Sequence, residues 1–338
     1  MDPLLFIWLF LLSEGIFQVY SLEETTNCRI HNHLFVCINN ENALQNVIFE
    51  DVNAVQTIDD IELHLENLNI VTLLEKSLTD VKNSTALYLS ENKLSVITRF
   101  FFQWLDQLTY LDLRNNIINN IEDGAFSKLT NLETLLLDGN YISKLGPTTW
   151  KGLVNLHELY ITNNTIILRK NMFKGLKQLE TLALDSNEIS DIPLGTFNGI
   201  SHIDLLYLSR NEISSLHSDI FKGLHQINEL DLSKNRLSSI PNGLFRNMKS
   251  LDSLWLNDNH LINIQAEAFV GLENLLFLFL SGNELESIDM SIFMNMKNVS
   301  VEPGFIIDGS LATNLTILRG ILRCESMGSQ DPYNCEEI

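Results

Sequence analysis

Residues 108–118 have the sequence LTYLDLRNNII, and residues 179–189 have the sequence LETLALDSNEI. Both segments place leucine at their first, fourth and sixth positions, asparagine at the ninth and isoleucine at the eleventh. The asparagine of this frame recurs every 24 residues, with a single step of 23 between the fourth and fifth copies: Asn92, Asn116, Asn140, Asn164, Asn187, Asn211, Asn235, Asn259 and Asn283. A tandem repeat therefore fills the middle of the chain.

Each position of the frame has a physical task. Side chains alternate along a strand, so Leu111 and Leu113 are expected to point inward while Asp112 points outward. Strands from successive repeats then stack into one parallel sheet. The asparagine ends the strand, and its amide is expected to satisfy backbone groups that would otherwise be buried without partners. We interpret the asparagines as structural residues and not as ligands.

The second half of each repeat is equally regular. An aromatic residue follows most of the asparagines by ten positions, and an apolar residue follows the aromatic by three. These aromatics are expected to form a second buried column beneath a convex side made of short helical or 3₁₀ turns: Phe102, Phe126, Trp150, Phe173, Phe197, Phe221, Phe245, Phe269 and Phe293. The column indicates packing and not a cofactor site.

The two ends of the chain differ from the repeats. Residues 4–12 are an unbroken apolar run, too short to span a bilayer but long enough for the core of a signal peptide. We predict a signal peptide over residues 1–21, an N-terminal cap over 22–60, about ten repeats over 61–298 and a C-terminal cap over 299–338. Caps are needed because terminal repeats would otherwise expose the core to water.

All four cysteines lie in the predicted caps. Cys28 and Cys37 are at one end, and Cys324 and Cys335 are at the other. A secreted chain favours disulfides over a metal site, and four cysteines allow three pairings. Pairing within each cap is favoured if the two ends lie far apart.

The repeat frame resembles the extracellular "typical" leucine-rich-repeat family, which includes Toll-like receptor ectodomains, the acid-labile subunit of insulin-like growth factor complexes and secreted insect proteins. The resemblance covers roughly residues 60–298. It implies an α/β solenoid: a horseshoe with a parallel concave β-sheet, an irregular or 3₁₀ convex side and disulfide-bonded caps. It also implies protein, glycan or lipid ligands. The chain departs from many relatives in having two cysteines at each end.

Charge narrows the class of partner. The chain has 338 residues, with 43 Asp and Glu against 22 Lys and Arg, a net charge of -21. This balance argues against nucleic acid or an anionic membrane surface as a partner, and it permits a basic protein. The excess acid has a simpler interpretation, which is that it keeps a large surface soluble. No catalytic motif, metal-ligand spacing or cofactor motif is present, so we expect neither an enzyme nor a cofactor.

Outward strand positions predict the binding face. Aromatic side chains on an exposed sheet are costly unless they are used, and Trp and Tyr are enriched at binding hot spots. We expect an apolar patch with an acidic rim at Tyr160, Leu205, Tyr207, Asp231, Trp255, Phe277 and Phe279. Two alternatives remain open: aromatics are good strand formers anyway, and the C-terminal cap could cover this surface.

Four N-glycosylation sequons begin at Asn83, Asn163, Asn298 and Asn314. A glycan on Asn163 would obstruct the middle of the concave face and leave its C-terminal part free.

The predicted function is a secreted module that binds an extracellular protein or glycan, in immunity, signalling or ligand carriage. The alternative is an adhesive or matrix component. A homodimer or a co-receptor complex is compatible with either.

Overall fold

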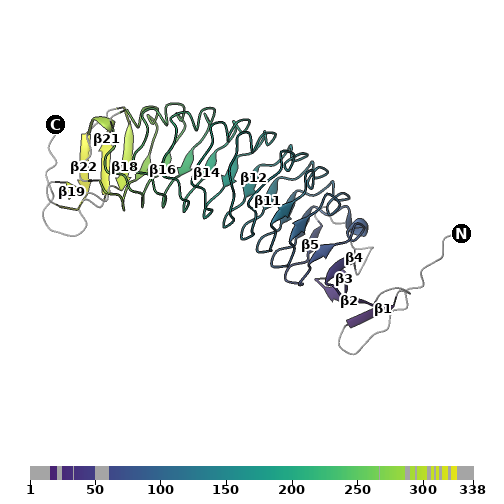
Figure 1. Cartoon of the computed structure of the whole chain (residues 1–338). Helices are drawn as coiled ribbons and strands as arrows, with labels where there is room; N and C mark the ends of the chain where they lie inside the picture. The colour runs from purple at the N-terminus through teal and green to yellow at the C-terminus, as the bar shows by residue number, and fades with distance from the viewer. Residues whose placement is uncertain are drawn as a thin grey trace. The chain divides into compact units, whose positions relative to one another are not determined.

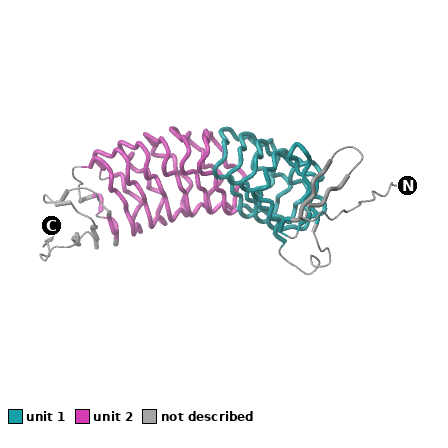
Figure 2. Tube along the Cα trace, turned by 90° about the horizontal axis from the view of Figure 1, so that it is seen from below, with its two compact units in different colours: residues 1–156 teal, residues 157–338 magenta. Residues whose placement is uncertain are grey.

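The computed structural model describes the repeats and most of the strands at either end. The described residues are 16–20, 25–32, 34–49, 61–265, 267–285, 290–293, 295–302, 306–307, 310–311, 314–318 and 321–325. They form two compact units, residues 1–156 and 157–338, each considered separately below (Figure 2).

Unit 1 begins with a five-stranded sheet that extends beyond the predicted cap of residues 22–60. Its first strand, β1 (Ile16–Tyr20), lies within the predicted signal peptide, and its last strand, β6 (Thr72–Leu73), lies within the predicted repeats. Its order is β1-β2-β3-β4-β6, antiparallel except for the parallel pair β4–β6. The strands are β1 (Ile16–Tyr20), β2 (Thr25–His31), β3 (Leu34–Asn39), β4 (Ala43–Phe49) and β6 (Thr72–Leu73). Alternate residues of β3 are buried, which explains the apolar positions Leu34, Val36 and Ile38.

The repeats of unit 1 contribute one short strand each to a parallel sheet. These strands are β5 (Glu62–His64), β7 (Ala86–Tyr88), β9 (Tyr110–Asp112) and β11 (Thr134–Leu136), paired in that order. A separate parallel pair joins β8 (Val96–Ile97) to β10 (Asn120–Ile121). Strands stacked this way appear in Figure 1 as successive arrows.

Unit 2 shows the same pattern of short parallel strands, one from each repeat. Its strands are β12 (Glu158–Tyr160), β13 (Thr181–Ala183), β14 (Leu205–Tyr207), β15 (Glu229–Asp231), β16 (Ser253–Trp255), β17 (Phe277–Phe279) and β18 (Asn298–Glu302). Two antiparallel strands, β21 (Asn314–Leu318) and β22 (Ile321–Glu325), follow β18, and β19 (Ile306–Ile307) pairs with β20 (Ser310–Leu311).

The predicted leucine-rich-repeat solenoid with a parallel sheet is confirmed, with two differences in detail. No α-helix occurs among the described residues, so the irregular side consists of turns and two 3₁₀ helices, η1 (Thr79–Val81) and η2 (Met290–Phe293). The parallel register also continues past the expected last repeat, because Phe279 of β17 pairs with Glu302 of β18.

The core consists of the two columns that the sequence predicts. The middle leucines of the strands, such as Leu111 and Leu254, are fully buried. The aromatics of the turn side are buried as well and stack from repeat to repeat, with ring centroids 6.3 Å apart for Phe173–Phe197 and 6.0 Å for Phe197–Phe221. Burial of these large apolar side chains is the main stabilising contribution to each repeat.

The asparagines form the expected ladder. Asn235 donates from Nδ2 to the carbonyls of Leu208 and Leu232 and accepts at Oδ1 from the amide of Ile213, at 2.9–3.1 Å. Asn116 and Asn259 repeat this arrangement. Each amide therefore satisfies backbone groups of its own repeat and of the preceding one, which confirms a structural role.

A second backbone feature recurs beside the ladder. The residue before the asparagine has a positive φ in repeat after repeat, at Asn115, Asn163, Ser186, Arg210, Lys234 and Asp258. A left-handed residue lets the chain leave the strand sharply, at some steric cost for residues other than glycine. The repeat frame carries no common residue type at this position.

Several expectations about the ends remain predictions. Cys37 is disulfide-bonded, and the register of β2 with β3 places the backbone of Cys28 directly opposite it, in agreement with a Cys28–Cys37 pair. Cys335 lies outside the described residues, so the pairing of Cys324 is untested. Residues 1–15 and 21–24, which hold the apolar run and the expected cleavage position, also lie outside them.

Candidate functional site

The outer face of the unit 2 sheet is formed by the first and third residue of each strand. In the third position the register aligns Tyr160, Ala183, Tyr207, Asp231, Trp255 and Phe279 on consecutive strands. In the first position it aligns Glu158, Thr181, Leu205, Glu229, Ser253 and Phe277. All seven residues predicted for the binding site therefore lie on this one face.

The C-terminal part of this face is a compact apolar cluster. The rings of Trp255 and Phe279 stack with centroids 5.4 Å apart and an interplanar angle of 2°. Phe277 and its neighbour Leu276 are 48 % and 45 % exposed. Together Trp255, Leu276, Phe277 and Phe279 make up what we call the aromatic patch. Strands about 4.8 Å apart bring such pairs of side chains into contact.

Tyr207 lies apart from the aromatic patch, because β15 separates its strand from that of Trp255. The Tyr207 hydroxyl donates to Glu229 Oε2 at 3.0 Å. Burial, followed by this carboxylate, raises the pKa of Tyr207 well above its usual value. The hydroxyl is consequently neutral at physiological pH and occupied by a partner within the sheet.

The predicted acidic rim is present, but basic residues interrupt it. Asp231 is half-buried and accepts from the backbone amide of Ser233 at 2.8 Å, which uses one of its oxygens to shape the chain. Asp252 accepts from Ser253 Oγ at 2.7 Å, and Asp258 is exposed. Arg210 and Lys234 are also exposed along this edge, so the rim carries both signs of charge.

Not every outward position is accessible. Thr181, Ala183 and Ser253 are buried although they occupy outer-face positions. Thr181 and Ala183 belong to β13, which lies between the strands of Tyr160 and Tyr207, so buried positions separate the two tyrosines. The structure therefore divides the seven predicted residues into the aromatic patch and a more polar N-terminal group.

A half-buried carboxylate near this face was missed from the sequence. Asp185 Oδ1 accepts from the backbone amide and the hydroxyl of Ser209 at 2.8 Å and 2.7 Å. Burial, partly offset by these hydrogen bonds, raises the pKa of Asp185 above its usual value. The aspartate ties two neighbouring repeats together, and only its place two residues before the ladder asparagine could have indicated this.

The sheet face of unit 1 has a different character. His64 stacks on Tyr88 with centroids 4.4 Å apart, and Tyr88 contacts Tyr110 at 5.1 Å. The His64 ring lies between Glu66 Oε1 at 2.9 Å and Glu62 Oε2 at 3.1 Å. This face thus pairs its aromatic and charged groups with one another.

Asp112, on the same face, differs from what the sequence predicts. The repeat frame places its side chain on the outer face, yet Asp112 is 1 % accessible because the Arg114 side chain folds back over it. Arg114 Nε and Nη2 donate to the two carboxylate oxygens at 3.0 Å and 2.8 Å. A bidentate pair of this kind compensates the burial of the carboxylate.

Two of the glycosylation sequons can be placed. Asn83 and Asn163 are exposed. Asn298 and Asn314 begin strands β18 and β21, and their side chains lie outside the described ones. Glycosylation of all four stays a prediction.

Other kinds of site are not indicated within the described ranges. Among those residues no group of three or more His, Cys, Asp or Glu side chains is arranged to hold a metal ion. No helix in that part of the chain is long and apolar enough to cross a membrane.

Comparison with known proteins agrees with the geometry. The family described as leucine rich repeat matches residues 106–166, 167–213, 201–261 and 251–301. Mouse epiphycan is 31 % identical over 107 residues, covering 25 % of this chain and 33 % of epiphycan. Bovine mimecan is 34 % identical over 107 residues, covering 25 % of this chain and 36 % of mimecan. The matches thus span about a third of these relatives.

Solved structures share the fold. A TLR13–ssRNA13 complex matches with a TM-score of 0.63 and 24 % identity, over 76 % of this chain and 41 % of that one. The Drosophila Toll–Spatzle complex matches with a TM-score of 0.59 and 18 % identity, over 86 % and 48 %. A leucine-rich-repeat protein of Leptospira interrogans matches with a TM-score of 0.62 and 24 % identity, over 75 % and 71 %. At these identities the likeness concerns the fold.

Proposed function

The chain belongs to the leucine-rich repeat family, and from that premise we propose that it is a secreted, non-catalytic module that binds an extracellular protein through the aromatic patch of unit 2. The observation that carries the proposal is the exposure of Leu276 and Phe277 beside the stacked pair Trp255–Phe279. Large apolar side chains clustered on an open sheet cost free energy in water, and a partner would remove that cost.

The charge around the patch indicates what the partner carries. Asp252 and Asp258 border the aromatic side chains on a chain of net charge -21. Carboxylates at the rim of an apolar surface speed association with a basic partner more than they add affinity. We therefore infer a protein surface with an apolar centre and basic side chains around it.

A pair of substitutions tests the proposal. Trp255→Ala with Phe279→Ala removes the stack without opening the core, since both rings lie on the outer face. Secreted fluid is passed over the immobilised wild-type and variant chains, and captured proteins are quantified by mass spectrometry. A partner that uses the patch is expected to lose about 2 kcal/mol or more of binding free energy, roughly thirtyfold in Kd.

A matched control separates the patch from general hydrophobicity. Ile117 and Tyr141 are 43 % and 62 % exposed in unit 1, so Ile117→Ala with Tyr141→Ala removes similar apolar area elsewhere. Circular dichroism confirms that both variants are folded. Capture that survives the Trp255 and Phe279 changes in a folded chain would reject the proposal.

The alternative is an adhesive or matrix component whose patch pairs with a second copy. The same exposed Leu276 and Phe277 would then lie in a self-interface. Light scattering after size exclusion distinguishes the two: a mass that rises with concentration and falls back in the Trp255/Phe279 variant supports adhesion.

A further inference from the structure

The turns of unit 2 on the side opposite the sheet carry a net positive charge, whereas the chain as a whole is strongly negative. Four consecutive turn segments, residues 169–177, 194–201, 217–225 and 242–249, follow one another in successive repeats. They hold seven of the 22 Lys and Arg residues of the chain and one of its 43 Asp and Glu residues. The acidic total therefore hides a basic surface, which we call the basic turn strip.

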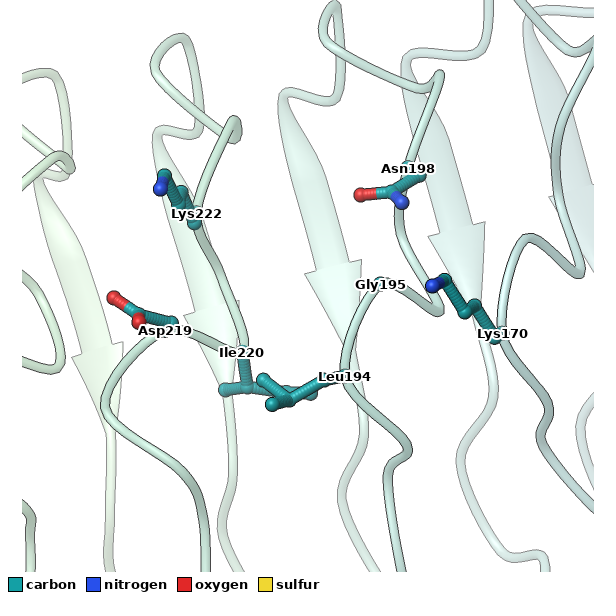
Figure 3. Close-up of a pocket in the computed structure, with 7 residues that line it drawn as sticks. All are labelled: Lys170, Leu194, Gly195, Asn198, Asp219, Ile220 and Lys222. Atoms are coloured by element: carbon teal, nitrogen blue, oxygen red, sulfur yellow. The ribbon is translucent and has the colours of Figure 1, made fainter.

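A groove crosses the middle of the basic turn strip. It has a volume of about 470 Å³ and is lined from three successive turns (Figure 3) by Lys170, Leu194, Gly195, Asn198, Asp219, Ile220 and Lys222. Leu194, 48 % exposed, gives it an apolar wall, and the Asn198 amide adds a polar group. An open groove of this kind suits an extended ligand more than an enclosed small molecule.

The lysines of the groove are free to meet a ligand. Lys170 and Lys222 are exposed and form no ion pair with any described residue. The carboxylate of Asp219, the one acid of the strip, is paired with the guanidinium of Arg246. The field in the groove is thus positive, and nothing within the strip offsets Lys170 or Lys222.

The spacing of the charges extends this field along the unit. Lys174, Asn198, Lys222 and Arg246 each follow the buried aromatic of their repeat by one residue. Those aromatics are 6.0–6.3 Å apart where they stack, so the column offers a polar or basic group at about every 6 Å. The strip ends at the next turn, which carries Glu267 and Glu273. A linear polyanion would meet a row of regularly spaced contacts.

From these observations we propose that the basic turn strip binds a sulfated polysaccharide, with Lys170 and Lys222 holding sulfate groups on either side of the groove. The Phe residues of the strip are buried, and it exposes no Phe, Tyr or Trp on which bases could stack, which disfavours a single-stranded nucleic acid. The proposal is independent of the aromatic patch, because it concerns different residues on the opposite side of the sheet.

Heparin affinity chromatography and a salt titration test the proposal on the full chain. The wild-type protein is expected to bind heparin at low ionic strength and to elute as salt rises, despite its net charge of -21. The variant Lys170→Gln/Lys174→Gln/Lys222→Gln is expected to raise the Kd about tenfold or more. The slope of log K against log salt should flatten by about one for each lysine removed.

The control carries the same change of net charge in unit 1. Lys76, Lys128 and Lys144 are exposed there, and Lys76→Gln/Lys128→Gln/Lys144→Gln should leave heparin binding within twofold of wild type. Three results would overturn the proposal: no heparin binding by the wild type at low salt, equal weakening in both triple variants, or equal binding of desulfated heparin. Tighter binding of a single-stranded oligonucleotide to the same lysines would replace the polysaccharide by a nucleic acid.

Discussion

The sheet faces of the two units are built from the same frame but treat their side chains differently. In unit 1, His64 is held by Glu62 and Glu66, and Asp112 is covered by Arg114. In unit 2, Trp255 and Phe279 contact each other while Phe277 remains half exposed. A face that pairs its own groups gains rigidity, whereas a face with uncovered apolar groups keeps binding free energy for a partner. The comparison supports the proposal that recognition uses unit 2.

The largest expected effect comes from substitutions in the buried cores of the two units. These substitutions test whether the cores differ as the sheet faces do. Leu111→Ala in unit 1 and Leu254→Ala in unit 2 each remove a fully buried leucine from the middle of a strand. Each is expected to lower the free energy of unfolding by about 2–5 kcal/mol, because a cavity replaces packed methyl groups. Urea denaturation measures this. A loss below about 1 kcal/mol in one unit only would show that the cores differ too.

Arg114→Ala should produce the next largest effect. The change leaves the Asp112 carboxylate buried without its bidentate partner, which is expected to cost about 1–3 kcal/mol of stability at neutral pH. Denaturation at several pH values measures the cost. In unit 2, Arg210→Ala is the matched control, since Arg210 is exposed and has no carboxylate partner among the described ion pairs; an equal loss there would remove the contrast.

Tyr207→Phe sharpens the comparison within unit 2. The substitution deletes the hydroxyl that donates to Glu229 and keeps the ring, so the expected loss of stability is about 0.5–1.5 kcal/mol. Spectrophotometric titration gives a second readout. Burial and then Glu229 raise the pKa of Tyr207, so its phenol should ionise at a higher pH than the other tyrosines. The tyrosine signal that titrates at the highest pH in the wild type should therefore be missing from the variant. An unchanged titration curve would contradict this assignment.

The smallest expected effect is a pH dependence from His64. Burial lowers its pKa, but hydrogen bonds to Glu66 and Glu62 outweigh burial, so the pKa in the folded chain is raised above 6.5. The folded state therefore binds the proton more tightly than the unfolded state, and the resulting stabilisation is complete below pH 6.5 and lost as pH rises through the raised pKa. The difference in Tm between wild type and His64→Gln should be larger at pH 5.5 than at pH 8.5. A Tm difference that increases with pH would contradict a raised pKa for His64.

The fold could be predicted from the sequence because the apolar side chains that repeat along the chain are the ones that form the core. Leu254 is buried and Trp255 lies on the outer face, as alternation along a strand requires. Exposure of individual outward positions could not be predicted in the same way. Asp112 and Ala183 are both buried at outward positions, Asp112 beneath Arg114, and the repeat pattern does not contain that contact.

Two other features could not be predicted from the sequence, for different reasons. The left-handed residue before each asparagine is Arg210 in one repeat and Asp258 in another, so its residue type gives no common signal. The basic turn strip could not be predicted because the net charge is summed over the whole chain and does not show where basic residues gather. Lys170 and Lys222 only stand out once the turns are placed side by side.

The asparagine ladder has a consequence for how such a chain changes. Asn259 bonds to Leu232 and Leu237 of the repeat before it and to Leu256 of its own, and Asn235 behaves in the same way. Coupling is therefore between nearest neighbours, as in a one-dimensional Ising chain. Duplicating or exchanging a whole repeat disturbs only the two junctions at its borders. Such a protein can acquire a new ligand by replacing a single module while the others keep their stability.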